Sequence, residues 1–151
     1  MQLGEADLQR FDEEGFIFVP DLFSAEELAV LKGEIPAVFA ERRPEVVREK
    51  TGDVVRTAFA THTYNDVYRR FVSHPRILEP AQQLLGGDVY IHQFKLNGKA
   101  AFDGDVWQWH QDYGTWQRDD DMPEARAMNL AVFLDEVNEF NGPLYIVPKS
   151  H

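Results

Sequence analysis

The 151-residue sequence has no cysteine, no apolar run long enough to cross a membrane and no excess of positive charge. The lack of cysteine excludes a disulfide framework, a thiolate zinc site and a cysteine nucleophile, and it fits a cytoplasmic protein. A membrane-spanning helix needs about 20 consecutive apolar residues. The segment MQLGEADLQRF at the N-terminus is acidic and lacks the basic start and apolar stretch of a secretion signal.

The formal net charge of −11 argues against nucleic acid as a partner, because an acidic surface repels phosphate. The charge also favours solubility. Hydrophobic residues make up 44% of the sequence and aromatic residues 13%, which is enough to bury a core. The length predicts one domain, residues 1–151.

Helical patterns are concentrated in the first half of the chain. Residues 5–14, 66–72 and 76–85 have apolar positions at helical spacing. Ser24 followed by Glu27 forms the sequence of a capping box, which predicts that another helix begins there. We expect Gly33 and Pro36 to weaken or kink that helix near its end.

Strand patterns dominate the second half. We expect strands at 16–20, 54–62, 89–97, 107–113, 128–137 and 143–147, and an exposed connection over 41–53. The 128–137 segment is apolar enough to be buried on both faces, and we expect Trp109 to lie in the core. Helices followed by antiparallel strands predict an α+β fold, mainly β, or a β-sandwich with helices along one side.

His110 and Asp112 are the strongest candidates for chemistry. On a strand, residues i and i+2 point to the same face, about 6.6–7 Å apart along the backbone, so their side chains can converge on one ion. A histidine and a carboxylate are two of the three ligands in the facial triad of non-haem Fe(II) oxygenases.

The same pair has simpler interpretations. A His-x-Asp sequence often forms only a hydrogen-bonded couple at the surface. A catalytic dyad, with Asp112 orienting His110 as a base, is a second alternative. Aromatic neighbours favour a site, because Trp107, Trp109 and Trp116 could shape a dry pocket around a metal.

Several separated segments together resemble the phytanoyl-CoA dioxygenase-like family of Fe(II)/2-oxoglutarate oxygenases. FDEEGFIFVPDLFSAEEL resembles the family's opening helix, strand and capped helix, WHQD at 109–112 resembles its metal motif, and FNGPLYIVPKSH at 140–151 resembles the segment that follows. Within the family, YIHQFKLN and the acidic loop after Trp116 resemble ectoine hydroxylases and, more strongly, bacterial hydroxylases of free L-leucine.

This resemblance implies a double-stranded β-helix, or jelly roll, with helices buttressing one sheet. It implies that Fe(II) binds His110 and Asp112, with 2-oxoglutarate and O2 as co-substrates. The implied reaction hydroxylates an aliphatic C–H bond of a small free amino acid such as leucine, giving succinate and CO2. Ectoine or another zwitterion is the alternative substrate.

The resemblance also assigns further residues. Gln93 and Trp116 match positions near the substrate, and Asn97 and Trp107 match positions that line the co-substrate. Strand parity places Gln93 and Asn97 on one face. Each polar residue is equally compatible with a surface or sheet-supporting role.

Two more residues of the VVRTAFATH segment, Arg56 and His62, match the leucine hydroxylases and are candidate substrate contacts. The planar guanidinium of Arg56 suits a substrate carboxylate. A surface salt bridge is its simpler role.

The family's third ligand, a histidine, and its 2-oxoglutarate-binding arginine follow the last matched segment, so we expect an incomplete domain that is part of a longer protein. His151 corresponds to a histidine that is not a ligand in the family. A fold relative or assembly module that lacks a complete metal site remains the alternative function.

Overall fold

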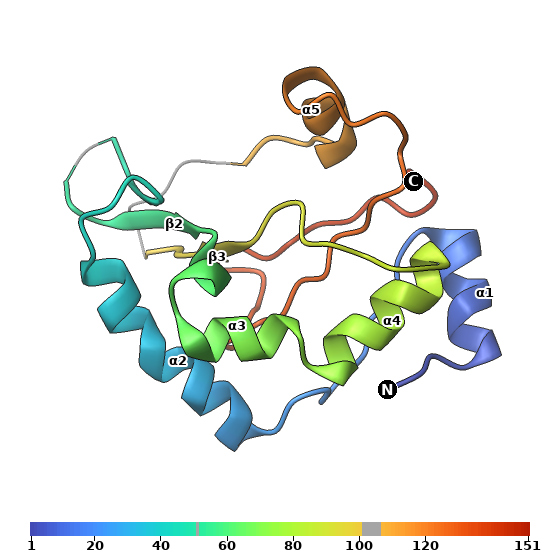
Figure 1. Ribbon diagram of the computed structural model, residues 1–151, viewed down its shortest axis with the longest axis horizontal. Coiled ribbons are helices and arrows are strands. Elements are labelled where there is room, and N and C mark those ends of the chain that lie inside the picture. The colour runs from blue at the N-terminus through green and yellow to red at the C-terminus, as the bar shows by residue number, and fades with distance from the viewer. Residues whose placement is uncertain (51, 101–106) are drawn as a thin grey trace.

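The computed structural model describes residues 1–50, 52–100 and 107–151. Helices α2, α3 and α4 lie along one side of a small sheet, and α5 stands on the other side (Figure 1). The helices are α1 (Glu5–Glu14), α2 (Ala25–Ala40), α3 (Asp66–Val72), α4 (Pro75–Leu85) and α5 (Asp112–Asp119), with a 3₁₀ turn η1 (Thr61–Thr63), and the strands are β1 (Val46–Arg48), β2 (Val55–Phe59) and β3 (Lys95–Asn97).

The helices of the first half confirm the sequence patterns. Ser24 caps α2 as predicted: its hydroxyl accepts a hydrogen bond from the Glu27 amide, and the Glu27 carboxylate accepts one from the Ser24 amide. The assigned helix runs unbroken past Gly33 and Pro36 to Ala40. Burial of Val38 in the core offsets the local cost of the proline.

The three strands form an antiparallel sheet in the order β1-β2-β3. Thr57 and Ala58 on β2 pair with Asn97 and Leu96 on β3, while a bulge interrupts the β1–β2 register at Val47/Arg48. β1 lies within the 41–53 segment that the sequence analysis treats as an exposed connection. Val46 of β1 is buried, so that prediction is wrong for part of the segment.

The core lies between α2, α3 and the sheet. Its buried residues are Leu31, Val38, Val46, Val55, Ala58, Tyr68 and Leu96. The Tyr68 hydroxyl donates to the Leu31 carbonyl at 2.9 Å, and burial raises the pKa of Tyr68 to about 12. This hydrogen bond ties α3 to α2 inside the core.

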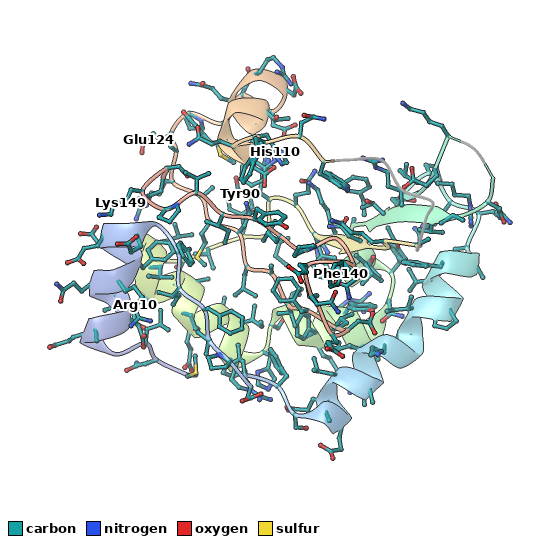
Figure 2. The ribbon with its side chains drawn as sticks, turned by 180° about the vertical axis from the view of Figure 1, so that it is seen from behind. Arg10, Tyr90, His110, Glu124, Phe140 and Lys149 are labelled. Carbon is teal, nitrogen blue, oxygen red and sulfur yellow. The ribbon has the colours of Figure 1, made fainter. Side chains whose placement is uncertain are left out.

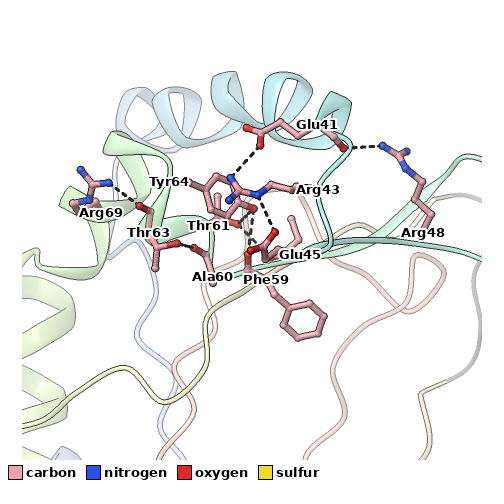
Figure 3. A network of polar contacts seen from close by, with 11 residues as sticks. Glu41, Arg43, Glu45, Arg48, Phe59, Ala60, Thr61, Thr63, Tyr64 and Arg69 are labelled. Carbon is pink, nitrogen blue, oxygen red and sulfur yellow. Dashed lines mark hydrogen bonds and ion pairs between the residues drawn. The ribbon is translucent and has the colours of Figure 1, made fainter.

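A polar network ties the end of α2 to the sheet (Figure 3). The Arg43 guanidinium lies 3.5 Å from the centre of the Tyr64 ring, and its Nε donates to Glu45 at 2.9 Å. The hydrogen bond to Glu45 raises the pKa of Arg43. Arg48 donates to the Glu41 carbonyl just past α2, so two arginines fix the direction in which the chain leaves the helix.

Several predicted strands are absent from the part of the chain that the structure describes. The structure assigns no strand at 16–20, 128–137 or 143–147; β2 covers only part of 54–62, and β3 only the end of 89–97. Alternation predicts an extended segment, but a strand also needs a neighbour to complete its hydrogen-bond ladder. Leu130, Phe133 and Val137 are exposed, so burial of 128–137 on both faces is wrong.

The predicted strand at 107–113 is also wrong. Residues 107–111 are irregular, and α5 begins at Asp112. An acidic residue in the first turn favours a helix, and Trp116, one turn later, is buried at 7% exposure. Trp109 is 70% exposed and contacts the Tyr145 ring, so its predicted core position is wrong.

Helices with a small antiparallel sheet make this an α+β structure, as expected, but helices and not strands predominate among the described residues. Among the described residues, no helix is both long and apolar enough to cross a membrane. The buried core lies in the part of the chain from α2 to β3, and α5 packs against this part through the contact of Trp116 with His92.

Candidate metal centre

His110 and Asp112 face one another at the start of α5. The Nε2 atom of His110 lies 3.4 Å from Oδ1 of Asp112. Two ligands at right angles, each about 2.1 Å from one ion, are about 3.0 Å apart. The predicted convergence of the two groups is therefore present, although an irregular residue and a helix start bring them together rather than a strand.

The other ring nitrogen of His110 is already engaged. Nδ1 lies 2.6 Å from the Gln108 carbonyl oxygen, which can only accept a hydrogen bond, so Nδ1 carries the proton. In the neutral ring this leaves the Nε2 lone pair directed toward Asp112. Metal-binding histidines are commonly oriented by such a bond to a carbonyl.

Asp112 is oriented in the same way. Asn129 donates from Nδ2 to Oδ2 of Asp112 at 2.8 Å, which leaves Oδ1 facing His110. Sequence reasoning missed both Asn129 and Gln108. No spacing rule connects Asn129 to the motif, since it lies 17 residues away along the chain.

The pair is accessible to a small ion. The side chain of His110 is 50% exposed and that of Asp112 is 23% exposed (Figure 2 shows His110 beneath α5). Among residues 1–50, 52–100 and 107–151, no cluster of three or more His, Cys, Asp or Glu side chains is placed to hold a metal. A nitrogen and an oxygen donor, each fixed by an outer hydrogen bond, fit two positions of a divalent metal site.

Arg56 and Trp107, two of the predicted site residues, are in contact. The Arg56 guanidinium lies 4.5 Å from the centre of the Trp107 ring, and its Nη1 donates to Glu49 at 3.3 Å. The ring therefore brings β2 close to the segment that leads to His110. The ion pair with Glu49 is the simpler role that the sequence analysis considered.

Asn97 and Gln93 are not brought together by a shared strand. Asn97 lies on β3 and its side-chain oxygen accepts a hydrogen bond from Thr57 at 2.9 Å. Gln93 precedes β3 and is exposed. The parity argument fails here because the extended pairing begins only at Lys95.

Trp116 and His62 are the remaining predicted residues. Trp116 packs edge-on against His92, with ring centres 5.0 Å apart. The His62 ring contacts Phe94 at 5.3 Å, and its buried Nδ1 has no hydrogen-bond partner within the described part of the chain. Burial, and then the positive charge of Arg69, lowers the pKa of His62.

His151 lies away from this centre. Its Nε2 is 3.1 Å from the Asp12 carbonyl oxygen, beside the end of α1. Pro148 and Lys149 form a turn, and the Lys149 amide donates to the Glu14 carbonyl at 2.9 Å. The structure therefore uses His151 to attach the last residues to α1.

Comparison with known proteins decides the family. Residues 11–151 match the family described as phytanoyl-CoA dioxygenase (PhyH). The chain belongs to the phytanoyl-CoA dioxygenase family. Over 141 residues the chain is 40% identical to L-proline trans-4-hydroxylase of Streptomyces griseoviridis. The matched residues cover 93% of this chain and 53% of that protein.

Ectoine dioxygenases are similar to the same extent. The enzyme of Halomonas elongata is 38% identical over 153 residues, with 99% of this chain and 46% of that protein covered. The chain therefore spans about half the length of the curated relatives it matches.

Solved structures agree with these relatives. The crystal structure of EctD from S. alaskensis with 2-oxoglutarate and 5-hydroxyectoine has a TM-score of 0.78 and 34% identity, and the match covers 82% of this chain and 45% of that one. The structure of EctD with bound Fe has a TM-score of 0.71, also at 34% identity, with 76% and 42% covered.

Proposed function

We propose that this protein is an Fe(II)- and 2-oxoglutarate-dependent hydroxylase of a small free amino acid or zwitterion. The observation that carries the proposal is the convergence of His110 Nε2 and Asp112 Oδ1 at 3.4 Å. Each group is oriented by an outer hydrogen bond, His110 by the Gln108 carbonyl and Asp112 by Asn129.

In this proposal His110 and Asp112 hold the iron, and a histidine from outside residues 1–151 completes the set. When bound, iron and 2-oxoglutarate would supply, with O2, the oxidising power that hydroxylates a C–H bond, and 2-oxoglutarate would leave as succinate and CO2. The part played by this chain is to hold two donors rigidly and to keep the Asp112 carboxylate from turning away. The Asn129 amide does the latter at 2.8 Å.

The roles of the other predicted residues follow from their positions. Asn97 and Trp107 would line the 2-oxoglutarate site, near the start of the segment that leads to His110. Arg56 contacts the Trp107 ring and would offer its guanidinium to a carboxylate in exchange for Glu49. Gln93, Trp116 and His62 remain proposed substrate contacts.

The identity of the substrate is the finer part of the proposal. Leucine is the sequence-based prediction, and the named relatives support proline and ectoine at least as well. These substrates are all small and carry a carboxylate and a positive charge. We also propose that the complete protein has the jelly-roll fold, into which α5 and the extended segments after it would be incorporated.

A turnover assay tests this function. The complete protein is incubated aerobically with Fe(II) and 2-oxoglutarate, together with leucine, proline or ectoine in turn, and succinate is measured. We expect substrate-dependent succinate that is lost in His110→Ala and retained in His74→Asn. The latter histidine caps α4 far from the centre, and asparagine preserves that cap. Succinate formation that survives His110→Ala would overturn the assignment.

A non-catalytic fold relative is the second candidate. Within the described residues, no group of three metal-binding side chains is present. This favours a non-catalytic relative over a metal site built by residues 1–151 alone. The same assay separates the two functions. A protein of this second kind forms no iron-dependent succinate with any of the three substrates, and it has no downstream histidine and arginine in its complete sequence.

A further inference from the structure

The helix that carries Asp112 is attached to the rest of the molecule near its other end. Within α5, which the structure describes in full, the buried residue is Trp116. Trp116 packs edge-on against the His92 ring, with centres 5.0 Å apart and planes at 66°. His92 belongs to the segment between α4 and β3, which rises toward α5 (Figure 1).

His92 makes a second contact with the same part of the chain. Its Nε2 lies 3.0 Å from Oδ2 of Asp120, the residue that follows α5. One imidazole therefore contacts the buried ring of the helix and, through its edge, the C-terminal end of the helix. A ring contact and a hydrogen bond on one side chain restrict both the position and the tilt of α5.

The helix transmits this restriction to Asp112. Trp116 lies four residues after Asp112, which is about 6 Å along the axis of an α-helix. A tilt of about 10° around Trp116 would therefore move the start of the helix by about 1 Å, and shifts of that size disturb a reactive site. The bond from Asn129 holds the Asp112 carboxylate at the start of α5, but it does not restrain the C-terminal end of that helix.

We propose that His92 and Asp120 are positioning residues, which fix α5 so that the Asp112 carboxylate stays beside His110. This inference rests on the proposed function only for the identity of the ion that the two donors hold. The placement of α5 by His92 is a property of the protein without metal and is testable separately.

Two substitutions isolate the hydrogen bond. His92→Phe keeps a ring against Trp116 and removes the bond to Asp120, and Asp120→Ala removes the same bond from the other side. The double variant should be no worse than either single variant, because both remove one interaction. His92→Ala removes the ring as well and should have the largest effect. His74→Phe is the matched control.

Two readouts make the test complete. Anaerobic calorimetry with Fe(II) alone on the complete protein should show affinity about tenfold weaker for His92→Ala, about threefold weaker for His92→Phe and Asp120→Ala, and unchanged for His74→Phe. Heteronuclear NMR of the metal-free protein should show shifted amide signals for residues 112–119 in the His92 variants. Rescue of most of the affinity by phenylalanine relative to alanine distinguishes positioning from loss of folding.

The outcomes separate the inference from the function beneath it. Unchanged Fe(II) affinity in His92→Ala, with unchanged amide signals in α5, overturns the positioning role. A protein that binds no Fe(II), or binds it equally well as His110→Ala, overturns the proposed function. In that case the NMR comparison still decides whether His92 places α5. A simple defect in folding would lower the thermal unfolding midpoint of His92→Phe as much as that of His92→Ala.

Discussion

The packed region, residues 25–97, and the site region, residues 107–151, are built in opposite ways. The packed region contains the whole buried core cluster. In the site region, which the structure describes throughout, Trp116 is the buried residue. Large apolar side chains are instead exposed there, among them Trp109, Phe133, Phe140, Leu144, Tyr145, Ile146 and Val147.

Because of this difference, the residues that determine the stability of the fold are not the residues that determine the geometry of the site. Gln108 and Asn129, which hydrogen-bond directly to His110 and Asp112, lie within the site region. His92, which contacts α5 from the packed region, is not part of the buried core cluster. The core can therefore be damaged without removing a donor, and a donor can be removed without opening the core. A substitution in one region can therefore serve as a control for a substitution in the other.

The largest effect should come from the core. Tyr68 is 2% exposed and donates a hydrogen bond to the Leu31 carbonyl, so Tyr68→Ala should cost about 3–5 kcal/mol in the free energy of unfolding. In the chain of residues 1–151 Tyr145 is 65% exposed, so Tyr145→Ala in this chain should change the free energy of unfolding by less than about 0.5 kcal/mol. Urea denaturation of both variants measures the difference. Equal losses would mean that the two regions are equally packed.

The next effect should appear in metal affinity and not in stability. Asn129→Ala frees the Asp112 carboxylate to rotate, and loss of such an outer hydrogen bond weakens metal binding about tenfold. Asn138→Ala, in the same region, removes only the local bond that its side-chain oxygen accepts from the Phe140 amide, and it should leave the affinity unchanged. Anaerobic Fe(II) calorimetry measures both. A tenfold loss in both variants would point to a general disturbance of the region.

A smaller effect is expected at the cap of α2. Ser24→Ala removes the hydroxyl that accepts from the Glu27 amide, which should lower the free energy of unfolding by about 1 kcal/mol. Ser150 also makes a local bond, to the Val147 carbonyl, but in the site region. Ser150→Ala should therefore have little effect on thermal or chemical unfolding. A larger loss in the free energy of unfolding for Ser150→Ala than for Ser24→Ala would contradict the expectation that the packed region carries the stability.

The smallest effect concerns pH. The pKa of His62 is lowered in the folded protein, mainly by burial and then by Arg69, so the unfolded chain takes up a proton there first. The contribution of the neutral His62 ring to the free energy of unfolding is fully present above about pH 6.5. It is lost as the pH falls toward the lowered pKa of the folded protein. His62→Phe should flatten the decline in urea midpoint below pH 6.5. Parallel curves would show that another group causes the decline.

The helices of the packed region were predictable because their signals are local. Ser24 with Glu27, and apolar residues at helical spacing in 66–72, specify elements that need no distant partner. Strands need partners, and alternation at 128–137 or 143–147 does not identify one. The predicted strand at 107–113 failed for a related reason, since burial of Trp116 against His92 favours a helix from Asp112.

The site was predictable in part. The two-residue spacing correctly predicted that the side chains of His110 and Asp112 lie close together, although they do so at a helix start and not on a strand. Their role as metal ligands stays a prediction. The roles of Asn129, His92 and Asp120 could not be predicted from the motifs, because these roles depend on how separate segments meet. The predicted contacts of Gln93, Asn97 and His62 with small molecules stay predictions.

The most direct test is an anaerobic Fe(II) titration of the complete protein beside two variants of one helix, Asp112→Ala and Asp119→Ala. Asp112 faces His110, whereas Asp119 pairs with Arg118 at the opposite end of α5. The account predicts that Asp112→Ala weakens Fe(II) binding by more than about a hundredfold, beyond the effect of losing an outer hydrogen bond, while Asp119→Ala binds normally. Equal affinity of the two variants would contradict it.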